Sequence, residues 1–179
     1  MKPILTAFCV LALTACGSTG PIKPAEGEEG AQSLDFSSYD QVIVRAFADG
    51  TKKQNMPETA GRLFADIIAA EVRSTGEFES VQVDDGEGRA IVIGGDVTRY
   101  ARGNGAMKFL VGLGAGSTHF EAEVTFVDSE TGETLGNLSV DKNSWALGGA
   151  IAASQSVEDF MTAAARKIAK EMSQAATDE

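Results

Sequence analysis

Three side chains capable of metal binding or proton transfer alternate along one short stretch, His119, Glu121 and Glu123. An imidazole with two carboxylates suits zinc or manganese, and paired carboxylates serve acid–base catalysis. In an extended strand, however, alternate Cα atoms lie roughly 6–7 Å apart, and these side chains stand on an exposed face. No second histidine is available to complete a metal site. We therefore expect no metal, no cofactor and no enzymatic activity.

A glycine-rich segment, residues 103–116, contains Gly112, Gly114 and Gly116 at alternate positions. A dinucleotide-binding fingerprint needs G-x-G-x-x-G between a strand and a helix, and a P-loop needs Lys-Ser/Thr after its last glycine. Here Ser117 and Thr118 follow instead and lead into a strand. A ligand-binding or hydrolytic protein that uses this segment remains an alternative.

Two segments, 106–116 and 146–153, combine large apolar residues with small ones. Small residues allow backbones to approach closely, and exposed apolar segments mark contact surfaces. One interpretation is a surface for a partner or for oligomer formation; the other is two loops packed against each other at one end of the sheet. On the first interpretation the candidate partner-binding residues are Met107, Phe109, Leu110, Leu113, Leu147 and Ile151.

The N-terminus has the form of a secretory signal peptide. Lys2 is followed by an uncharged, mostly apolar run over residues 4–15, which is too short to span a bilayer. The sequence Leu-Thr-Ala-Cys-Gly over residues 13–17 resembles the lipobox of bacterial lipoproteins, which implies cleavage before Cys16 and lipidation of its thiol. An ordinary cleaved signal or a short buried helix is the alternative. Cys9 would leave with the signal, so no disulfide is expected.

Composition predicts one acidic domain. The 179 residues carry a formal net charge of −11, which disfavours binding to nucleic acid, and 43% are hydrophobic, which excludes a disordered chain. We predict a signal peptide over 1–15, an acylated Cys16 with a flexible tether to residue 33, and a single domain over 34–176. Gly17, in place of Asp, resembles the outer-membrane sorting pattern, although the inner membrane stays open.

Periodicity predicts five strands and two helices. The strands are expected over residues 41–47, 78–83, 90–100, 118–127 and 134–145. Gly94-Gly95 predicts a bulge or a close backbone approach. The first helix is expected to be capped by Asn55 and to end at Gly76, and the second to be capped by Ser156. The order β-α-β-β-β-β-α gives an α+β two-layer sandwich with a mixed or antiparallel sheet.

The apolar residues of each predicted helix fall on one face. Those of the first helix are Leu63, Phe64, Ile67, Ile68 and Val72. Those of the second helix are Val157, Phe160, Met161, Ala164, Ile168 and Met172. We expect both faces to pack on the sheet.

Four features follow one another along the chain: the 42–47 strand, the 64–83 helix–strand unit, Gly-Asp-Val-Thr-Arg-Tyr over 95–100, and 124–128 with Thr131-Gly132. Over about residues 34–174, their order resembles a bacterial lipoprotein family catalogued as domain of unknown function 4410. The element order is also similar to small periplasmic lipoprotein domains that bind and assemble. The resemblance implies a lipid-anchored, periplasm-facing accessory module that binds an envelope protein; a self-assembling envelope component is an alternative.

Overall fold

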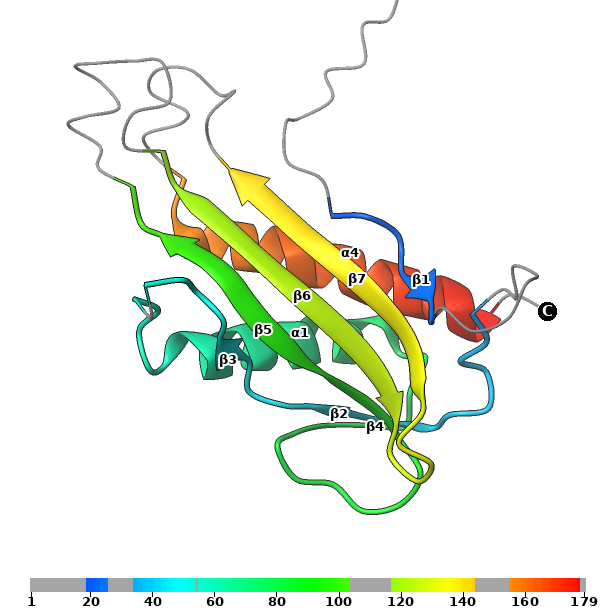
Figure 1. The fold of residues 1–179 in the computed structure, drawn as a ribbon. Helices are drawn as coiled ribbons and strands as arrows, with labels where there is room; N and C mark the ends of the chain where they lie inside the picture. Colours follow the sequence, from blue (N-terminus) through cyan, green and yellow to red (C-terminus); the bar gives the residue numbers. More distant parts are fainter. Residues whose placement is uncertain (1–18, 26–33, 54, 104–116, 144–154, 178–179) are drawn as a thin grey trace, which may run out of the picture.

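The computed structural model describes residues 19–25, 34–53, 55–103, 117–143 and 155–177, and its elements are drawn in Figure 1. Its strands are β1 (Lys23–Pro24), β2 (Gln41–Val44), β3 (Ala48–Asp49), β4 (Ser80–Val83), β5 (Ile91–Ala101), β6 (His119–Asp128) and β7 (Thr134–Asn143). Its helices are α1 (Ala60–Thr75) and α4 (Val157–Thr177). The predicted α+β class is confirmed, and the five longer strands are those predicted. The two-residue strands β1 and β3 were not predicted.

The sheet is mixed, in the order β1-β7-β6-β5-β2-β4, with β3 paired to β5. Strand β2 runs parallel to β4 and β5, whereas β5, β6 and β7 form an antiparallel meander. The two arrangements follow from the connections. Helix α1 carries the chain from β2 back to a parallel neighbour, and a short polar loop joins β6 to β7.

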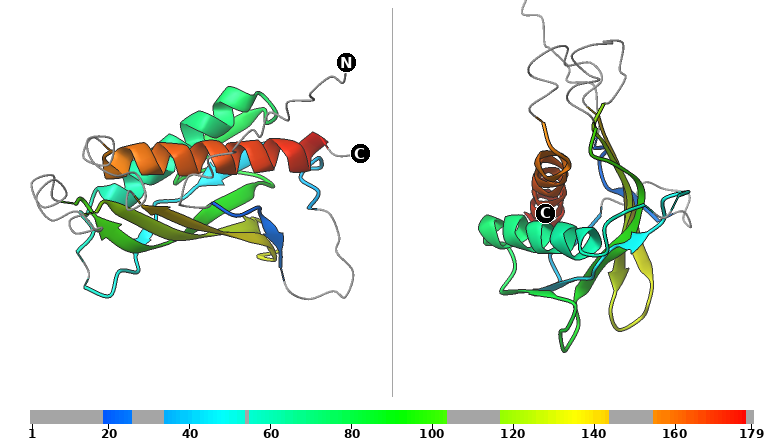
Figure 2. Two further views of the ribbon diagram at one scale, coloured as in Figure 1. Left: turned by 90° about the horizontal axis from the view of Figure 1, so that it is seen from above. Right: turned by 90° about the vertical axis from the view of Figure 1, so that its left-hand side faces the viewer.

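Both helices lie on one face of the sheet (Figure 2). The inner face of β6 alternates as predicted, because Phe120, Ala122, Val124 and Phe126 are buried under the helices. Phe64 of α1 is fully buried, with ring centroids 4.8 Å from Phe47 and 4.9 Å from Phe120. Aromatic stacking between α1 and the sheet therefore forms the centre of the core.

The buried stripe of α1 is shifted from the predicted one. Phe64, Ile68 and Val72 are buried, but Leu63 is 40% exposed and Ile67 lies at the margin of the core. Ala65 and Ala69 are buried instead, because small side chains let α1 lie close to α4. All six residues predicted for the second helical stripe are buried, which confirms that prediction.

The predicted start of α1 is wrong, because the helix begins at Ala60 and its N-cap residue Thr59 makes no side-chain capping bond. Asn55 donates its backbone N–H to Thr51 Oγ1 at 3.1 Å, and Met56 donates its own to Asp49 Oδ2 at 3.2 Å. These bonds hold the preceding residues in a loop anchored on Asp49. The helix therefore starts later than its local cap signal predicts.

Helix α4 begins with the cap that the sequence predicts. Ser156 Oγ accepts the Asp159 backbone N–H at 3.1 Å, while Asp159 Oδ2 accepts the Ser156 backbone N–H at 2.8 Å. This reciprocal arrangement satisfies two backbone donors at the helix start. The Ser156 backbone N–H, and then its hydroxyl, which donates to Asp159 Oδ2 at 2.9 Å, lower the pKa of the Asp159 carboxyl below its usual value.

Gly95 confirms the predicted close approach of two backbones. Its φ is +140°, and a Cβ atom there would lie 1.9 Å from the carbonyl oxygen of Glu123 on β6. Only glycine fits this position without moving a strand. The irregularity in the β5–β6 register falls further along, between Val97 and Arg99.

Part of the predicted tether lies against the domain. Within the predicted range 16–33, residues 19–25 follow the edge of β7, with Lys23 opposite Asn137, and Ile22 is 6% exposed. A single large apolar residue between glycines and prolines predicts a segment without a buried side chain. The prediction is wrong at these residues because β7 offers an unpaired strand edge and a buried position for the Ile22 side chain.

Candidate functional site

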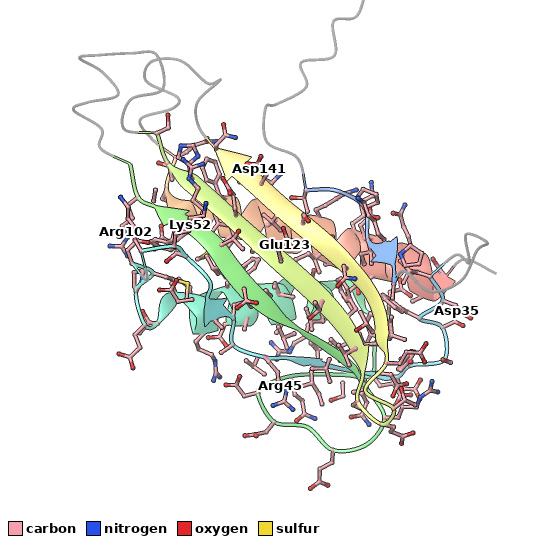
Figure 3. All side chains as sticks on the ribbon, viewed as in Figure 1. Asp35, Arg45, Lys52, Arg102, Glu123 and Asp141 are labelled. Carbon is pink, nitrogen blue, oxygen red and sulfur yellow. The ribbon has the colours of Figure 1, made fainter. Side chains whose placement is uncertain are left out.

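The face of the sheet opposite the helices is polar and is the candidate site. We call it the open face. Its side chains include Asp96, Arg99, Glu121, Glu123, Ser139 and Asp141. Figure 3 shows Glu123 and Asp141 on this face of β6 and β7.

A bulge at Thr98 arranges this face. The register shifts between Val97 and Arg99, so that Arg99 lies opposite Glu121 while Val97 and Tyr100 both stay buried. Without the extra residue, strict alternation would turn Tyr100 outward and Arg99 into the core. The bulge therefore keeps a cation on the open face.

Acidic residues on the open face stand directly opposite one another. Asp96 pairs across strands with Glu123, and Glu121 pairs with Asp141. Like charges in these positions repel, and two contacts relieve the repulsion. Arg99 Nη1 lies 2.9 Å from Glu121 Oε1, and Ser139 Oγ donates to Glu123 Oε2 at 2.7 Å. Each predicted carboxylate thus has a neighbouring donor.

Two hollows flank the open face. The first, of about 460 Å³, lies between the 51–55 loop and β5 and gathers Lys52, Lys53 and Arg99 beside Glu121. We call it the basic hollow; Lys52 and the nearby Arg102 are labelled in Figure 3. Its cations stand out in a chain whose net charge is −11. They give this corner of the molecule a local preference for anionic groups.

The second hollow, of about 570 Å³, lies at the opposite end of the sheet beside the β6–β7 turn. Ile43, Val92 and Val127 form its floor, and Arg45 lines one side. Ile43 is only 3% exposed because the 84–88 loop covers it, with Gly86 in close contact. Ile43 is therefore already covered, whereas Val92 and Val127 stay partly exposed.

A buried carboxylate, missed by sequence reasoning, holds the β6–β7 turn. Asp128 is 2% exposed; its Oδ2 accepts the Tyr39 hydroxyl at 2.7 Å and Arg89 Nε at 3.2 Å. Its Oδ1 accepts the backbone N–H groups of Thr131 at 2.9 Å and Glu130 at 2.8 Å. The guanidinium of Arg89 also lies over the Tyr39 ring, 4.4 Å from its centroid.

These bonds determine the titration of the cluster. The Thr131 backbone N–H and the Tyr39 hydroxyl hold the pKa of Asp128 well below its usual range. Burial, and then the hydrogen bond to Asp128, raise the pKa of Tyr39 above its ordinary value. These interactions favour the ionised form of the carboxylate. An Asp followed three residues later by Thr-Gly signals such a turn, but its partners come from distant positions.

The structure places the predicted metal candidates along β6. His119, Glu121 and Glu123 follow one another on the open face, where His119 lies opposite Asn143. Glu121 and Glu123 contact Arg99 and Ser139 as described above. Among the described residues, no group of three or more His, Cys, Asp and Glu side chains is arranged to hold a metal ion.

The predicted partner-binding residues and Cys16 lie outside the described residues. The described ends of the two loop segments nevertheless lie together. Thr118 Oγ1 donates to the backbone oxygen of Gln155 at 3.1 Å and lies 3.5 Å from that of Arg102. Both segments therefore start and finish at the same end of the sheet, above the basic hollow.

A mixed sheet with two helices on one face and a polar opposite face defines an α+β domain. Neither helix in the described part of the chain is long and apolar enough to cross a bilayer. The family model described as "Domain of unknown function (DUF4410)" matches residues 28–148. The chain belongs to this family, as the sequence resemblance predicted. No curated protein matches the chain.

Solved structures with the same fold include PelC of Paraburkholderia phytofirmans. A PelC dodecamer is 17% identical, with a TM-score of 0.57 over 91% of this chain and 99% of PelC. A dodecamer of a PelC variant is 16% identical, with a TM-score of 0.59 over 87% and 96%. Protein XCC0632 from Xanthomonas campestris, of family DUF330, is 12% identical, with a TM-score of 0.47 over 74% and 83%. The PelC likeness establishes the fold alone.

Proposed function

We propose that this chain is a lipid-anchored, non-catalytic protein of the bacterial outer membrane that faces the periplasm and works by binding protein. Its first partner is another copy of itself, and an envelope protein of another kind is the second. The acyl chains on Cys16 would hold it to the membrane, since several chains together make a stable anchor.

The observation that carries the proposal is the open face. Strands β5, β6 and β7 are covered by helices on one face only and present a polar surface about ten residues long on the other. Charges of both signs stand on it, with acids in the middle and the cations Lys52, Lys53 and Arg99 at one corner. Such a surface favours a partner with the complementary pattern.

The PelC structures support self-association. Both are dodecamers, and the shared fold covers 96% and 99% of the PelC chains. A head-to-tail assembly uses two different surfaces of each copy. The open face supplies one of them in our proposal. The apolar residues Leu110 and Leu113, outside the described part, are candidates for the other.

A non-catalytic role agrees with the contacts on this face. Glu121 and Glu123 are bound to Arg99 and Ser139, and Asp128 accepts from four donors, two of them in the β6–β7 turn. A general base needs a free lone pair directed at a substrate and a pKa near the working pH. The hydrogen bonds that Asp128 accepts lower the pKa of its carboxyl, which moves it further from a working pH near neutrality.

Sedimentation velocity of the lipidated chain in mild detergent tests the proposal. We expect one discrete assembly many times larger than the lipidated monomer. Reversing two charges on the open face, Glu123→Lys with Asp141→Lys, should dissociate it while leaving the circular dichroism unchanged. The matched control, Asp66→Lys with Glu79→Lys, changes the net charge by the same amount at exposed positions outside β5, β6 and β7 and should leave it assembled.

The double substitution Leu110→Asp with Leu113→Asp tests the apolar segment in the same assay. Loss of assembly with an intact fold supports a contact role, and unfolding assigns these residues to the core. A wild-type chain that stays monomeric, and that captures no envelope protein after crosslinking in native membranes, contradicts the proposal. So does a Cys16→Ala chain that still fractionates with the outer membrane.

A further inference from the structure

The segment between the proposed lipid anchor and the domain lies along the edge of β7. We call residues 19–25 the N-terminal strap. Gly20 N–H donates to the backbone oxygen of Ser139, and Ala25 N–H to that of Leu135, both at 3.3 Å. Thr19 forms a bridge with Val140, so the contact extends along most of β7.

Strand β7 is shaped to receive the strap. At Gly136, opposite Pro24, an added Cβ atom would lie 2.9 Å from both Ile22 Cγ2 and the Lys23 carbonyl oxygen. Ile22 and Leu34 fill that space instead, and Ile22 joins the main core. A buried side chain seated over a glycine marks an integral edge strand, which a flexible tether would not provide.

The direction of the strap determines which end of the domain is near the anchor. The strap runs antiparallel to β7, so its N-terminus leads to the end of the sheet where β7 finishes and β6 begins (Figure 1). We call this the anchor end. Cys16 precedes Thr19 by three residues, which span at most about 11 Å when extended. A free chain over residues 17–33 would average about 23 Å end to end.

Charge supports the same orientation. Described segments at the anchor end, 49–53, 99–103, 119–121, 140–143 and 155–159, carry five basic and five acidic side chains. Segments at the opposite end, 35–40, 77–79, 84–90 and 128–133, carry ten acidic side chains and one basic, Arg89, and Arg45 beside the second hollow adds one further cation. Anionic lipid head groups repel the second set and tolerate the first.

We infer that the strap fixes the domain with its anchor end against the lipid surface and its acidic end in the periplasm. This inference rests on the proposed lipidation of Cys16. The partner of the anchor end is an anionic phospholipid bilayer, and strand pairing to β7 transmits the position of the anchor to the sheet.

Site-directed quenching in vesicles tests the inference. The lipidated full chain is reconstituted in vesicles of phosphatidylethanolamine and phosphatidylglycerol that contain a head-group quencher. After cleavage and lipidation no free thiol remains. Single probes can therefore be placed at Lys53→Cys, at the anchor end, and at Glu130→Cys, at the acidic end. Both positions are exposed.

We expect quenching at position 53 to exceed that at position 130 several-fold, because the 11-residue β5 separates the ends by roughly 35 Å. Equal quenching of the two probes on a chain that floats with the vesicles overturns the inference and leaves the lipid anchor standing. A chain that does not float with the vesicles overturns both.

Variants of the strap provide the control. Ile22→Asp should release it and make the two probes equivalent, whereas Lys23→Asp, at an exposed neighbour, should preserve the difference. A Gly-Ser insertion of about ten residues between Ser18 and Thr19, adding roughly 17 Å of reach, should reduce the difference without touching the fold. A difference that survives both the release and the insertion assigns the orientation to something other than the strap, and overturns the inference.

Discussion

The two faces of β6 differ in the interactions that their side chains make. Phe120 and Phe126 on the inner face are fully buried under the helices, whereas Glu121 and Glu123 on the open face are held by one exposed ion pair and one hydroxyl. Adjacent residues of one strand therefore serve different purposes. The inner face determines stability, because burial of aromatic area outweighs exposed charge pairs. The open face can vary its contacts at little cost to the fold.

The largest expected effect is in the core, where α1 packs on the inner face of β6. Phe64→Ala should lower the free energy of unfolding by about 3–5 kcal/mol, because it removes a fully buried ring between Phe47 and Phe120. Chemical denaturation at pH 7 measures the change. The adjacent Leu63→Ala, at an exposed position, should cost less than about 1 kcal/mol. Similar losses for the two variants would contradict the assignment of the faces.

Asp128 should give the next largest effect, together with a pH signature. Its pKa is lowered in the folded chain, so the ionised carboxylate stabilises the fold above about pH 4, the ordinary range of an unfolded Asp, and this contribution is lost as the pH falls below it. Asp128→Asn should therefore lower Tm at pH 7 and flatten its fall between about pH 5 and pH 2.

Glu130→Gln, an exposed change in the same turn, is the control for Asp128 and should leave the pH profile unchanged. A wild-type Tm that does not fall in acid, or a Glu130 variant that reproduces the Asp128 effect, would contradict the stabilising role assigned to the buried Asp128 carboxylate.

The cap of α4 should contribute a smaller amount. Ser156→Ala removes the acceptor for the Asp159 backbone N–H and should cost about 1 kcal/mol in the free energy of unfolding. Ser156→Thr keeps a hydroxyl at that position and should restore most of the loss. Thermal denaturation of the three chains in parallel measures both, and an Ala variant as stable as wild type would mean that the cap bond is dispensable.

The smallest effect is expected on the open face. Glu121→Gln breaks an ion pair with Arg99 in which both side chains are partly exposed, so stability should change by less than about 0.5 kcal/mol. A double-mutant cycle with Arg99→Ala measures the coupling. A coupling above about 1 kcal/mol would mean that the open face helps to hold the fold, and would weaken the contrast between the faces.

The elements that local pattern determines were predicted well. Strict alternation over 118–127 and the Ser156 cap identified β6 and α4, because each depends on residues within a few positions of one another. The start of α1 was missed because Asp49, outside the helix, binds the backbone at Met56. Tyr39 and Asp128 meet across 89 residues of sequence. No local pattern contains such a pair, so the turn cluster was not predictable.

The same holds for the N-terminal strap, whose burial depends on Gly136. The prediction of two apolar segments as a partner surface stays a prediction, since Phe109 and Leu147 lie outside the described residues. The open face was foreseen only as the solvent side of one strand. Its arrangement needed the bulge at Thr98, which the sequence does not signal.

The pairing of Lys23 with Asn137 also sets an order of events during folding. These residues are 114 positions apart, so the segment that follows the proposed lipid anchor is among the last to be placed. Until β7 has formed, the whole length of chain that precedes β2 would separate the sheet from that proposed anchor. In that interval the edge of β7 is open to any other extended segment, a neighbouring copy included. The strap thus competes with intermolecular strand pairing as the chain folds.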